Sequence, residues 1–382
     1  MSAGEHKPEI LFATIAAGGG HVAGAHAMSE AIERYYPGRF ELRVSDYMED
    51  LGIIRLDRFH KDSWRRALRY PVLARVGQRV IDAFPRLTIA VERRILRDFA
   101  RAAAADLRED PPLLVVSNHG LITTGLAEAR HRYGLEVPAL TYATEPFNIS
   151  AYWAEPRVDR VIVASEDGRR RLLRFGVPVD RMTIIGRPVR QAFLNAPTKP
   201  EAREYLGLED RFTCLVSFGG EGVGRDPRGL IRALLDSDVP LQVVAITGRN
   251  KVLREDLRRL RPGTNSLLVE GFVENLAEYL ASSDVFVGKA GPSSVYEALA
   301  VGRPVLASGY AGLNELGVVR FIEHEGLGRY VRTNAALRGE VQRYASYPAL
   351  LEDVARRCRQ LDLASSTERF AHHIVRYALT GA

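Results

Sequence analysis

The sequence predicts an α/β protein with two doubly wound domains, each a parallel sheet covered by helices on both faces. Short apolar runs alternate with helical segments, a pattern typical of parallel sheets. The 382 residues also exceed one ordinary domain. Residues 187–200 hold three prolines and lose periodicity, and they separate two such runs. We therefore expect domains at 1–190 and 200–364 that face each other across a cleft, with a C-terminal helix, 365–382, packing back on the first.

The expected strands are short and rich in Val, Ile and Leu, as strands buried on both faces of a sheet are. In the first domain they are expected at 9–15, 40–45, 113–116, 138–143, 161–164 and 183–186. In the second domain they are expected at 213–218, 241–247, 267–269, 285–287 and 304–307. Helices fill the gaps, among them 23–35 and 165–175. Ligands of such sheets bind at the carboxyl ends of the strands, so the loops after the strands are the candidate sites.

The stretch 287–304, VGKAGPSSVYEALAVGRP, gives the clearest local indication of a ligand. A buried strand ends there, and Ser293 or Ser294 is expected to cap a helix over 295–301. Backbone N–H groups at the positive end of that helix suit an anionic diphosphate. Glu297 lies one turn further on, where its carboxylate can accept two ribose hydroxyls. An ordinary capped helix accounts for the same residues equally well.

Other glycine turns follow other expected strands. AAGGGH follows the first strand, and its glycines allow another molecule to approach the backbone. It lacks the G-x-G-x-x-G spacing of a dinucleotide fingerprint, and no acidic residue is placed to bind a second ribose. GGEGVG follows the strand at 213–218, and Gly248-Arg249-Asn250 follows the strand at 241–247. These turns are all expected to open toward the cleft.

Composition narrows the function classes. The chain is 46% hydrophobic and 26% charged, as soluble globular proteins are, and no apolar run is long enough to span a membrane. The first ten residues lack the apolar core of a signal peptide, so we expect a cytoplasmic protein. Cys214 and Cys358 are too few for a disulfide framework, and neither has a partner at metal-ligand spacing.

The formal net charge of +6 is concentrated in a helical segment at 51–107. Cationic residues alternate there with large apolar ones, which describes an amphipathic surface that can rest on anionic lipid. Trp64 and Tyr70 lie among the arginines, and Trp64, Arg65, Arg66 and Arg69 are the candidate membrane contacts. A helix pair that packs its apolar face into its own domain is the alternative. No nucleic-acid-binding signature accompanies the charge, so we expect no nucleic-acid partner.

Several motifs in order resemble those of a known family. FGGEGVG at 218–224 resembles a Gly-Gly-Glu-Gly loop, GRNK at 248–251 a base-binding segment, and EGFV at 270–273 with KAGPSS at 289–294 a nucleotide signature. In the first domain, GGGH at 18–21 resembles an acceptor-side loop. Together they are similar to the GT-B glycosyltransferases, above all the monogalactosyldiacylglycerol synthases and processive diacylglycerol glucosyltransferases. The lipid II-forming N-acetylglucosaminyltransferase is a more distant relative.

The resemblance implies transfer of a sugar, with inversion, from a UDP-sugar to a lipid hydroxyl, with diacylglycerol as the expected acceptor. Backbone N–H groups and the helix dipole would stabilise the diphosphate leaving group without a metal or other cofactor. Glu297 would hold the ribose, and the backbone at Phe272 and Val273 would read the uracil. The donor-binding residues carried over are Gly219, Gly220, Glu221, Gly222, Arg249, Phe272, Val273, Ala290, Gly291, Pro292, Ser293, Ser294, Glu297, Asn314 and Glu315.

An acceptor hydroxyl needs a general base that is active near neutral pH. His21 is the candidate and Glu145 its competitor. Gly19, Gly20 and His119 are the expected acceptor-binding residues. Combined with the basic helices, the resemblance implies a peripheral protein on the inner face of the membrane.

Two positions depart from the family pattern. Relatives usually carry Thr-Asp and a nearby His where this chain has TEPF at 144–147, and an Asn where it has Val318. These departures motivate a non-catalytic nucleotide-sugar-binding protein as an alternative. A glycosyltransferase with a soluble small-molecule acceptor and a nucleotide-sugar epimerase, which shares the architecture, are two further alternatives.

Overall fold

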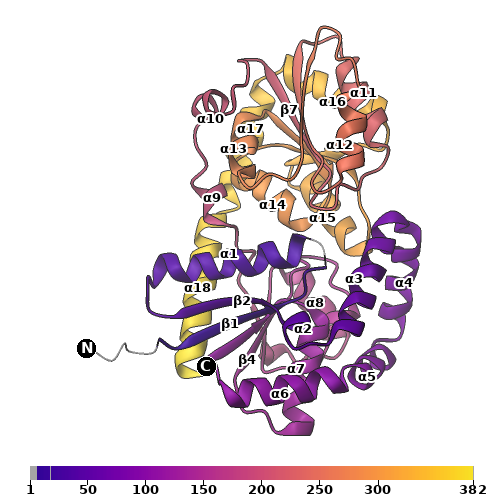
Figure 1. The fold of residues 1–382 in the computed structure, drawn as a ribbon. Helices are drawn as coiled ribbons and strands as arrows, with labels where there is room; N and C mark the ends of the chain where they lie inside the picture. Colours follow the sequence, from indigo (N-terminus) through magenta and orange to yellow (C-terminus); the bar gives the residue numbers. More distant parts are fainter. Residues whose placement is uncertain (1–6, 18, 382) are drawn as a thin grey trace. The chain divides into compact units, whose positions relative to one another are not determined.

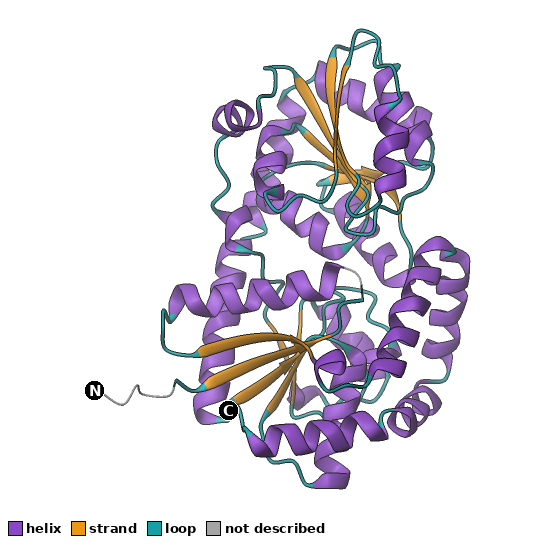
Figure 2. Cartoon of the chain, viewed as in Figure 1, coloured by secondary structure: helices purple, strands orange, loops and turns teal. Residues whose placement is uncertain are grey.

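The computed structural model describes residues 7–17 and 19–381, which form two compact units (Figure 1). The first unit comprises the chain up to Arg190 together with Ala364 onward, and the second comprises Gln191–Leu363. Each unit contains one six-stranded parallel sheet with helices packed against it (Figure 2). The doubly wound α/β class expected from the sequence is thereby confirmed.

The first sheet has the order β2-β1-β3-β4-β5-β6. Its strands are β1 (Glu9–Thr14), β2 (Glu41–Asp46), β3 (Leu114–Ser117), β4 (Ala139–Tyr142), β5 (Arg160–Val163) and β6 (Met182–Ile184). Strand β1 is central and pairs with both β2 and β3, so that Ile10 lies opposite Leu42 and Leu114. The chain leaves β1 in one direction along the sheet and β3 in the other, which makes the gap between these two strands the switch point of the sheet.

The helices of the first unit cover both faces of this sheet. They are α1 (Gly19–Tyr35), α2 (Tyr47–Asp50), α3 (Ile54–Arg69), α4 (Pro71–Ala83), α5 (Pro85–Ile95), α6 (Arg97–Glu109), α7 (Gly120–Tyr133), α8 (Glu166–Arg174) and α18 (Leu363–Thr380), with short 3₁₀ turns η1 (Ala151–Trp153) and η2 (Val179–Arg181). Ile10 and Phe12 of β1 pack with α1 and with Phe370 of α18, whereas Leu11 and Ala13 pack with α6 and α7. Because successive side chains of β1 point to opposite faces of the sheet, this one strand contributes to a hydrophobic core on each face.

The second sheet has the order β12-β11-β10-β7-β8-β9, the arrangement of a dinucleotide-binding fold read from its far edge. Its strands are β7 (Phe212–Ser217), β8 (Leu241–Ile246), β9 (Ser266–Glu270), β10 (Val285–Lys289), β11 (Val305–Gly309) and β12 (Gly328–Tyr330). Its helices are α9 (Gln191–Leu194), α10 (Lys199–Leu206), α11 (Pro227–Leu235), α12 (Lys251–Arg258), α13 (Leu276–Ser282), α14 (Pro292–Ala300), α15 (Leu313–His324), α16 (Asn334–Ser346) and α17 (Ala349–Gln360). The switch point lies between β7 and β10.

Most elements lie within two residues of their expected bounds, with three differences. Strand β12 was not expected, α1 begins at Gly19 rather than residue 23, and α14 begins at Pro292 rather than residue 295. Among the described helices, none combines the length and apolarity needed to cross a membrane.

Candidate functional site

The switch point of the first sheet carries a cluster of imidazoles. The connection after β1 leads to His21, and β3 leads directly to Asn118 and His119. His21 was expected in a loop, but it lies in the first turn of α1, because the glycines before it begin the helix. Gly19 and Gly20 are exposed at that helix start. Gly18, the first glycine of the motif, lies outside the described residues.

The ring of His21 is fixed by the backbone of its neighbour. Its Nδ1 lies 2.8 Å from the Asn118 carbonyl oxygen, which can only accept, so Nδ1 carries the proton. Asn118 Nδ2 in turn donates to the His21 carbonyl oxygen at 2.6 Å. The neutral ring therefore keeps its lone pair on Nε2, the arrangement a general base requires.

The electrostatic surroundings keep His21 neutral. Burial lowers its pKa to about 4, against the opposing hydrogen bond to Asn118, and the nearby His60 and Arg187 lower it further. At neutral pH the imidazole is therefore in the unprotonated form.

His119 and two residues that sequence reasoning missed complete the cluster. His119 is buried, its ring lies 4.7 Å from that of His21, and its Nε2 lies 3.1 Å from Nε2 of His60 on α3. The Tyr152 hydroxyl lies 3.1 Å from His119 Nδ1. Neither His60 nor Tyr152 stands in a recognisable motif, because they are brought here by the packing of α3 and η1.

Glu145 lies on the loop after β4 and is partly buried. Its carboxylate accepts the Ser150 N–H at 2.9 Å, and burial raises its pKa to about 7 against that hydrogen bond. Asp82 of α4 accepts a hydrogen bond from the Ala151 N–H at 2.8 Å and forms an ion pair with Arg171. The loop that carries Glu145 is thus tied to α4.

In the second unit, the loops after β7 and β8 lock together. A Cβ on Gly222 would lie 2.2 Å from the Thr247 carbonyl oxygen, and one on Gly248 would lie 2.4 Å from that of Gly219. Gly219, Gly222 and Gly248 also have positive φ angles, which favour glycine. Gly220 accepts the Arg249 N–H at 2.9 Å. The two interlocked loops form a glycine-lined edge, and Glu221 on the first loop is half-buried.

Arg249 and Phe272 pair at the same edge. The guanidinium lies over the Phe272 ring, 4.6 Å from its centroid, and the ring is 54% exposed. Val273 follows and is half-buried. An exposed aromatic ring with a cation on one face is a suitable neighbour for a planar base.

The helix after β10 begins one turn earlier than expected. Its N-cap is Gly291 and Pro292 occupies the first helical position, so Ser293 and Ser294 lie in the first turn. The expectation that a serine caps the helix is wrong, because Pro292, which has no N–H to lose, takes the first position. Ala290 donates its N–H to Gly309 and is buried. Glu297 follows in the second turn and is buried.

The first turn of α15 carries the last pair of expected donor residues. Asn314 is half-buried and Glu315 buried. Glu315 Oε2 accepts the Ala311 N–H at 2.6 Å, and Oε1 lies 3.2 Å from Nζ of Lys289 at the end of β10. Val318 is fully buried one turn further on, so it serves the core.

Helices α4 and α5 expose large apolar side chains. Val72, Leu73, Val76, Val80, Phe84, Leu87, Val91 and Ile95 are all exposed, and we call them the apolar face. Helix α3 directly precedes α4 in the chain, and its Arg65, Arg66 and Arg69 are also exposed. Trp64 differs, because its ring packs against the core and its Nε1 is buried.

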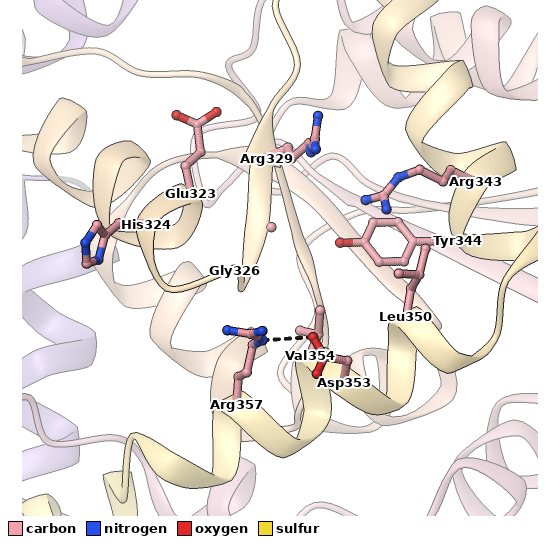
Figure 3. A pocket seen from close by; sticks show the side chains of 11 residues that line it. Glu323, His324, Gly326, Arg329, Arg343, Tyr344, Leu350, Asp353, Val354 and Arg357 are labelled. Carbon is pink, nitrogen blue, oxygen red and sulfur yellow. Dashed lines mark hydrogen bonds and ion pairs between the residues drawn. The ribbon is translucent and has the colours of Figure 1, made fainter.

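A cavity of about 390 Å³ lies among β12, α15, α16 and α17 (Figure 3). Its lining contains no residue of the loops after β7, β8 and β10. Its arginines are all ion-paired, Arg329 and Arg343 with Glu340 and Arg357 with Asp353. The charges of these three arginines are therefore already matched by carboxylates of the protein. Across residues 7–17 and 19–381, no group of three or more His, Cys, Asp or Glu side chains is placed to hold a metal ion.

Comparisons with known proteins agree with the resemblance expected from the motifs. Residues 230–336 match the family model described as Glycosyl transferases group 1. A probable monogalactosyldiacylglycerol synthase of Nicotiana tabacum is 27% identical over 340 residues, covering 86% of this chain and 63% of the relative. A processive diacylglycerol beta-glucosyltransferase of Bacillus subtilis is 26% identical over 270 residues, 70% of each chain. The expected resemblance to these two groups is confirmed.

The fold also has solved counterparts. HepE of Anabaena, crystallised with UDP, aligns with a TM-score of 0.57 at 16% identity, covering 98% of this chain and 100% of that one. The GT-B assignment expected from the sequence is thereby confirmed. The chain spans about 63% of the length of the plant synthase that it matches.

Proposed function

We propose that the protein is a glycosyltransferase that moves a sugar from a UDP-sugar to the hydroxyl of a lipid, with diacylglycerol as acceptor and with inversion. The observation that carries the proposal is the glycine-lined edge at the β7–β10 switch point, with Gly219 and Gly222 on one strand end and the start of α14 on the next. Ligands of doubly wound sheets bind at such a point. The relatives' names supply the substrate class.

In the donor site, the Gly291–Ser294 segment begins α14 and directs the positive end of its dipole at the diphosphate. Glu297 holds the ribose, and Phe272 with Val273 lies against the uracil. Asn314 and Glu315 hold the sugar. The protein's own groups neutralise the leaving group, with no metal cofactor.

His21 is the proposed general base. Its Nδ1 proton is committed to Asn118, so Nε2 can take the proton of the acceptor hydroxyl as the new glycosidic bond forms. His119, Gly19 and Gly20 line the acceptor side. Glu145, whose pKa burial raises to about 7, is the competing candidate.

The lipid acceptor requires contact with a membrane. The apolar face on α4 and α5 is large, and exposed arginines precede it on α3, which suits an anionic lipid surface. We place the protein as peripheral on the inner, cytoplasmic face. Trp64 is left out of this contact because its ring faces the core.

The test is a donor screen. Purified protein is incubated with several UDP-sugars and diacylglycerol vesicles, and lipid products are read by mass spectrometry. A glycolipid that Glu297→Ala no longer makes supports the proposal. Donor consumption without lipid would favour an epimerase, whereas nucleotide binding without turnover would favour a binding protein. A product only with soluble acceptors would overturn the lipid assignment.

A further inference from the structure

Lys289 lies where the two glycine turns of the second unit meet. It is the last residue of β10, which pairs with β7 across the switch point. A Cβ on Gly219, after β7, would lie 4.0 Å from Lys289 Cε, and one on Gly291, after β10, would lie 3.6 Å from it. The lysine stem is therefore flanked by both turns.

The ammonium group is held but not enclosed. Its Nζ lies 3.2 Å from Glu315 Oε1, and the lysine side chain remains 31% exposed while that of Glu315 is 5% exposed. The second oxygen of Glu315 accepts the Ala311 N–H, which fixes the carboxylate. An ammonium has three donors on a flexible stem, so it can reach a new anion while staying near this carboxylate.

Two arginines near this edge have partners of their own. Arg249 lies over the Phe272 ring, and Arg254 pairs with Glu270 at 3.6 Å. Among the described residues, Lys289 is the cation whose stem lies against both Gly219 and Gly291.

We propose that Lys289 is the residue that neutralises the diphosphate of the donor, and that Glu315 holds its ammonium in place until the donor arrives. The inference rests on the proposed donor site. As the bond between sugar C1 and the β-phosphate oxygen breaks, its electron pair stays on that oxygen, and the acceptor oxygen bonds to C1 and loses its proton to the base. Lys289 keeps its own proton and stabilises the charge on the departing diphosphate.

Calorimetry with uridine, UMP and UDP tests this role. Lys289→Met is expected to weaken UDP binding about 10- to 100-fold, as loss of a charge-assisted contact does. Its affinity for uridine should stay within about twofold of that of the wild-type protein. Lys289→Arg should restore most of the UDP affinity. Arg259→Met removes the same charge from the exposed C-terminal end of α12 and is the matched control, expected to change neither affinity.

The outcomes separate the two proposals. If Lys289→Met binds both uridine and UDP as tightly as the wild-type protein, the role of Lys289 is wrong but the proposed donor site stands. If the wild-type protein binds neither uridine nor UDP, the proposed function itself is wrong.

A second variant tests the part given to Glu315. Glu315→Gln keeps an acceptor for the Ala311 N–H but removes the charge that competes for Lys289, so UDP binding should stay equal or become tighter, while turnover falls. If Glu315→Gln weakens UDP binding as much as Lys289→Met does, the pair is only a structural ion pair and the proposal is wrong.

Discussion

His21 and Asn118 bind each other twice across the switch point of the first sheet. The imidazole Nδ1 donates to the Asn118 carbonyl oxygen, and the Asn118 amide donates to the His21 carbonyl oxygen. One pair of contacts thereby fixes the tautomer of the ring and the start of α1.

The pH dependence of the reaction distinguishes the two candidate bases. A base acts only when deprotonated, and the pKa is about 4 for His21 and about 7 for Glu145. If His21 is the base, kcat/KM should stay level on its acidic side down to about pH 5 and fall near pH 4. An acidic limb near pH 7 that disappears in Glu145→Gln would assign the role to Glu145 instead.

Removal of the Asn118 side chain should disturb catalysis more than donor binding. Asn118→Ala leaves the backbone carbonyl but releases the first turn of α1, so kcat should fall about tenfold or more through misplacement of His21. Stability should fall by about 1–2 kcal/mol, measured by urea unfolding. UDP affinity, measured by calorimetry, should not change. A parallel loss of UDP affinity would contradict a role confined to the acceptor side.

Glu92 should make the protein less stable as the pH rises. Burial in α5 raises its pKa from 4.5 to about 8, against a hydrogen bond from Thr124. Between these values the folded state holds a proton that the unfolded chain has released, so stability falls as the pH rises through this window. Glu92→Gln should gain on the order of 2 kcal/mol at pH 8 and little at pH 4. A gain independent of pH would refute this explanation.

The apolar face should control lipid binding. Leu73→Ser with Leu87→Ser removes two side chains that are 66% and 62% exposed, so flotation with anionic vesicles should weaken about tenfold or more. UDP binding should stay unchanged. Leu379→Ser is the control, because this leucine is 54% exposed and lies on α18, outside the apolar face. An equal loss of vesicle binding per leucine in the double variant and in the control would mean that the face has no special role.

A chelator should leave the reaction rate unchanged if protein groups alone neutralise the diphosphate. EDTA treatment followed by the glycolipid assay measures this directly. Recovery of a lost rate on addition of Mg²⁺ or Mn²⁺ would show that a metal shares the task.

The elements that depend on local pattern were predictable from the sequence. Apolar runs followed by glycine turns identified the strands ending at Ser217 and Lys289 and the loops after them. Strand β12 was missed because Gly328–Tyr330 contains no apolar run. The start of α14 was misjudged because serines were favoured as caps over the Gly291-Pro292 pair.

The side chains gathered by tertiary packing were not predictable. His60 lies in a basic helical segment, and nothing in its surroundings along the chain points to His119. Glu92 likewise becomes a buried carboxyl only through the packing of α5 near Thr124. The roles given to His21, Glu297 and the other site residues stay predictions.

The interlocked turns at Gly222 and Gly248 limit what mutational scanning can reveal. Any side chain at either position would strike backbone atoms of the neighbouring turn, at 2.2 Å for Gly222 and 2.4 Å for Gly248. Loss of activity in an alanine variant at either position would therefore reflect disruption of the two turns, whether or not the substrate contacts that residue. Evidence for nucleotide contact has to come from side chains that can be shortened without disturbing the two interlocked turns, such as those of Phe272 and Lys289.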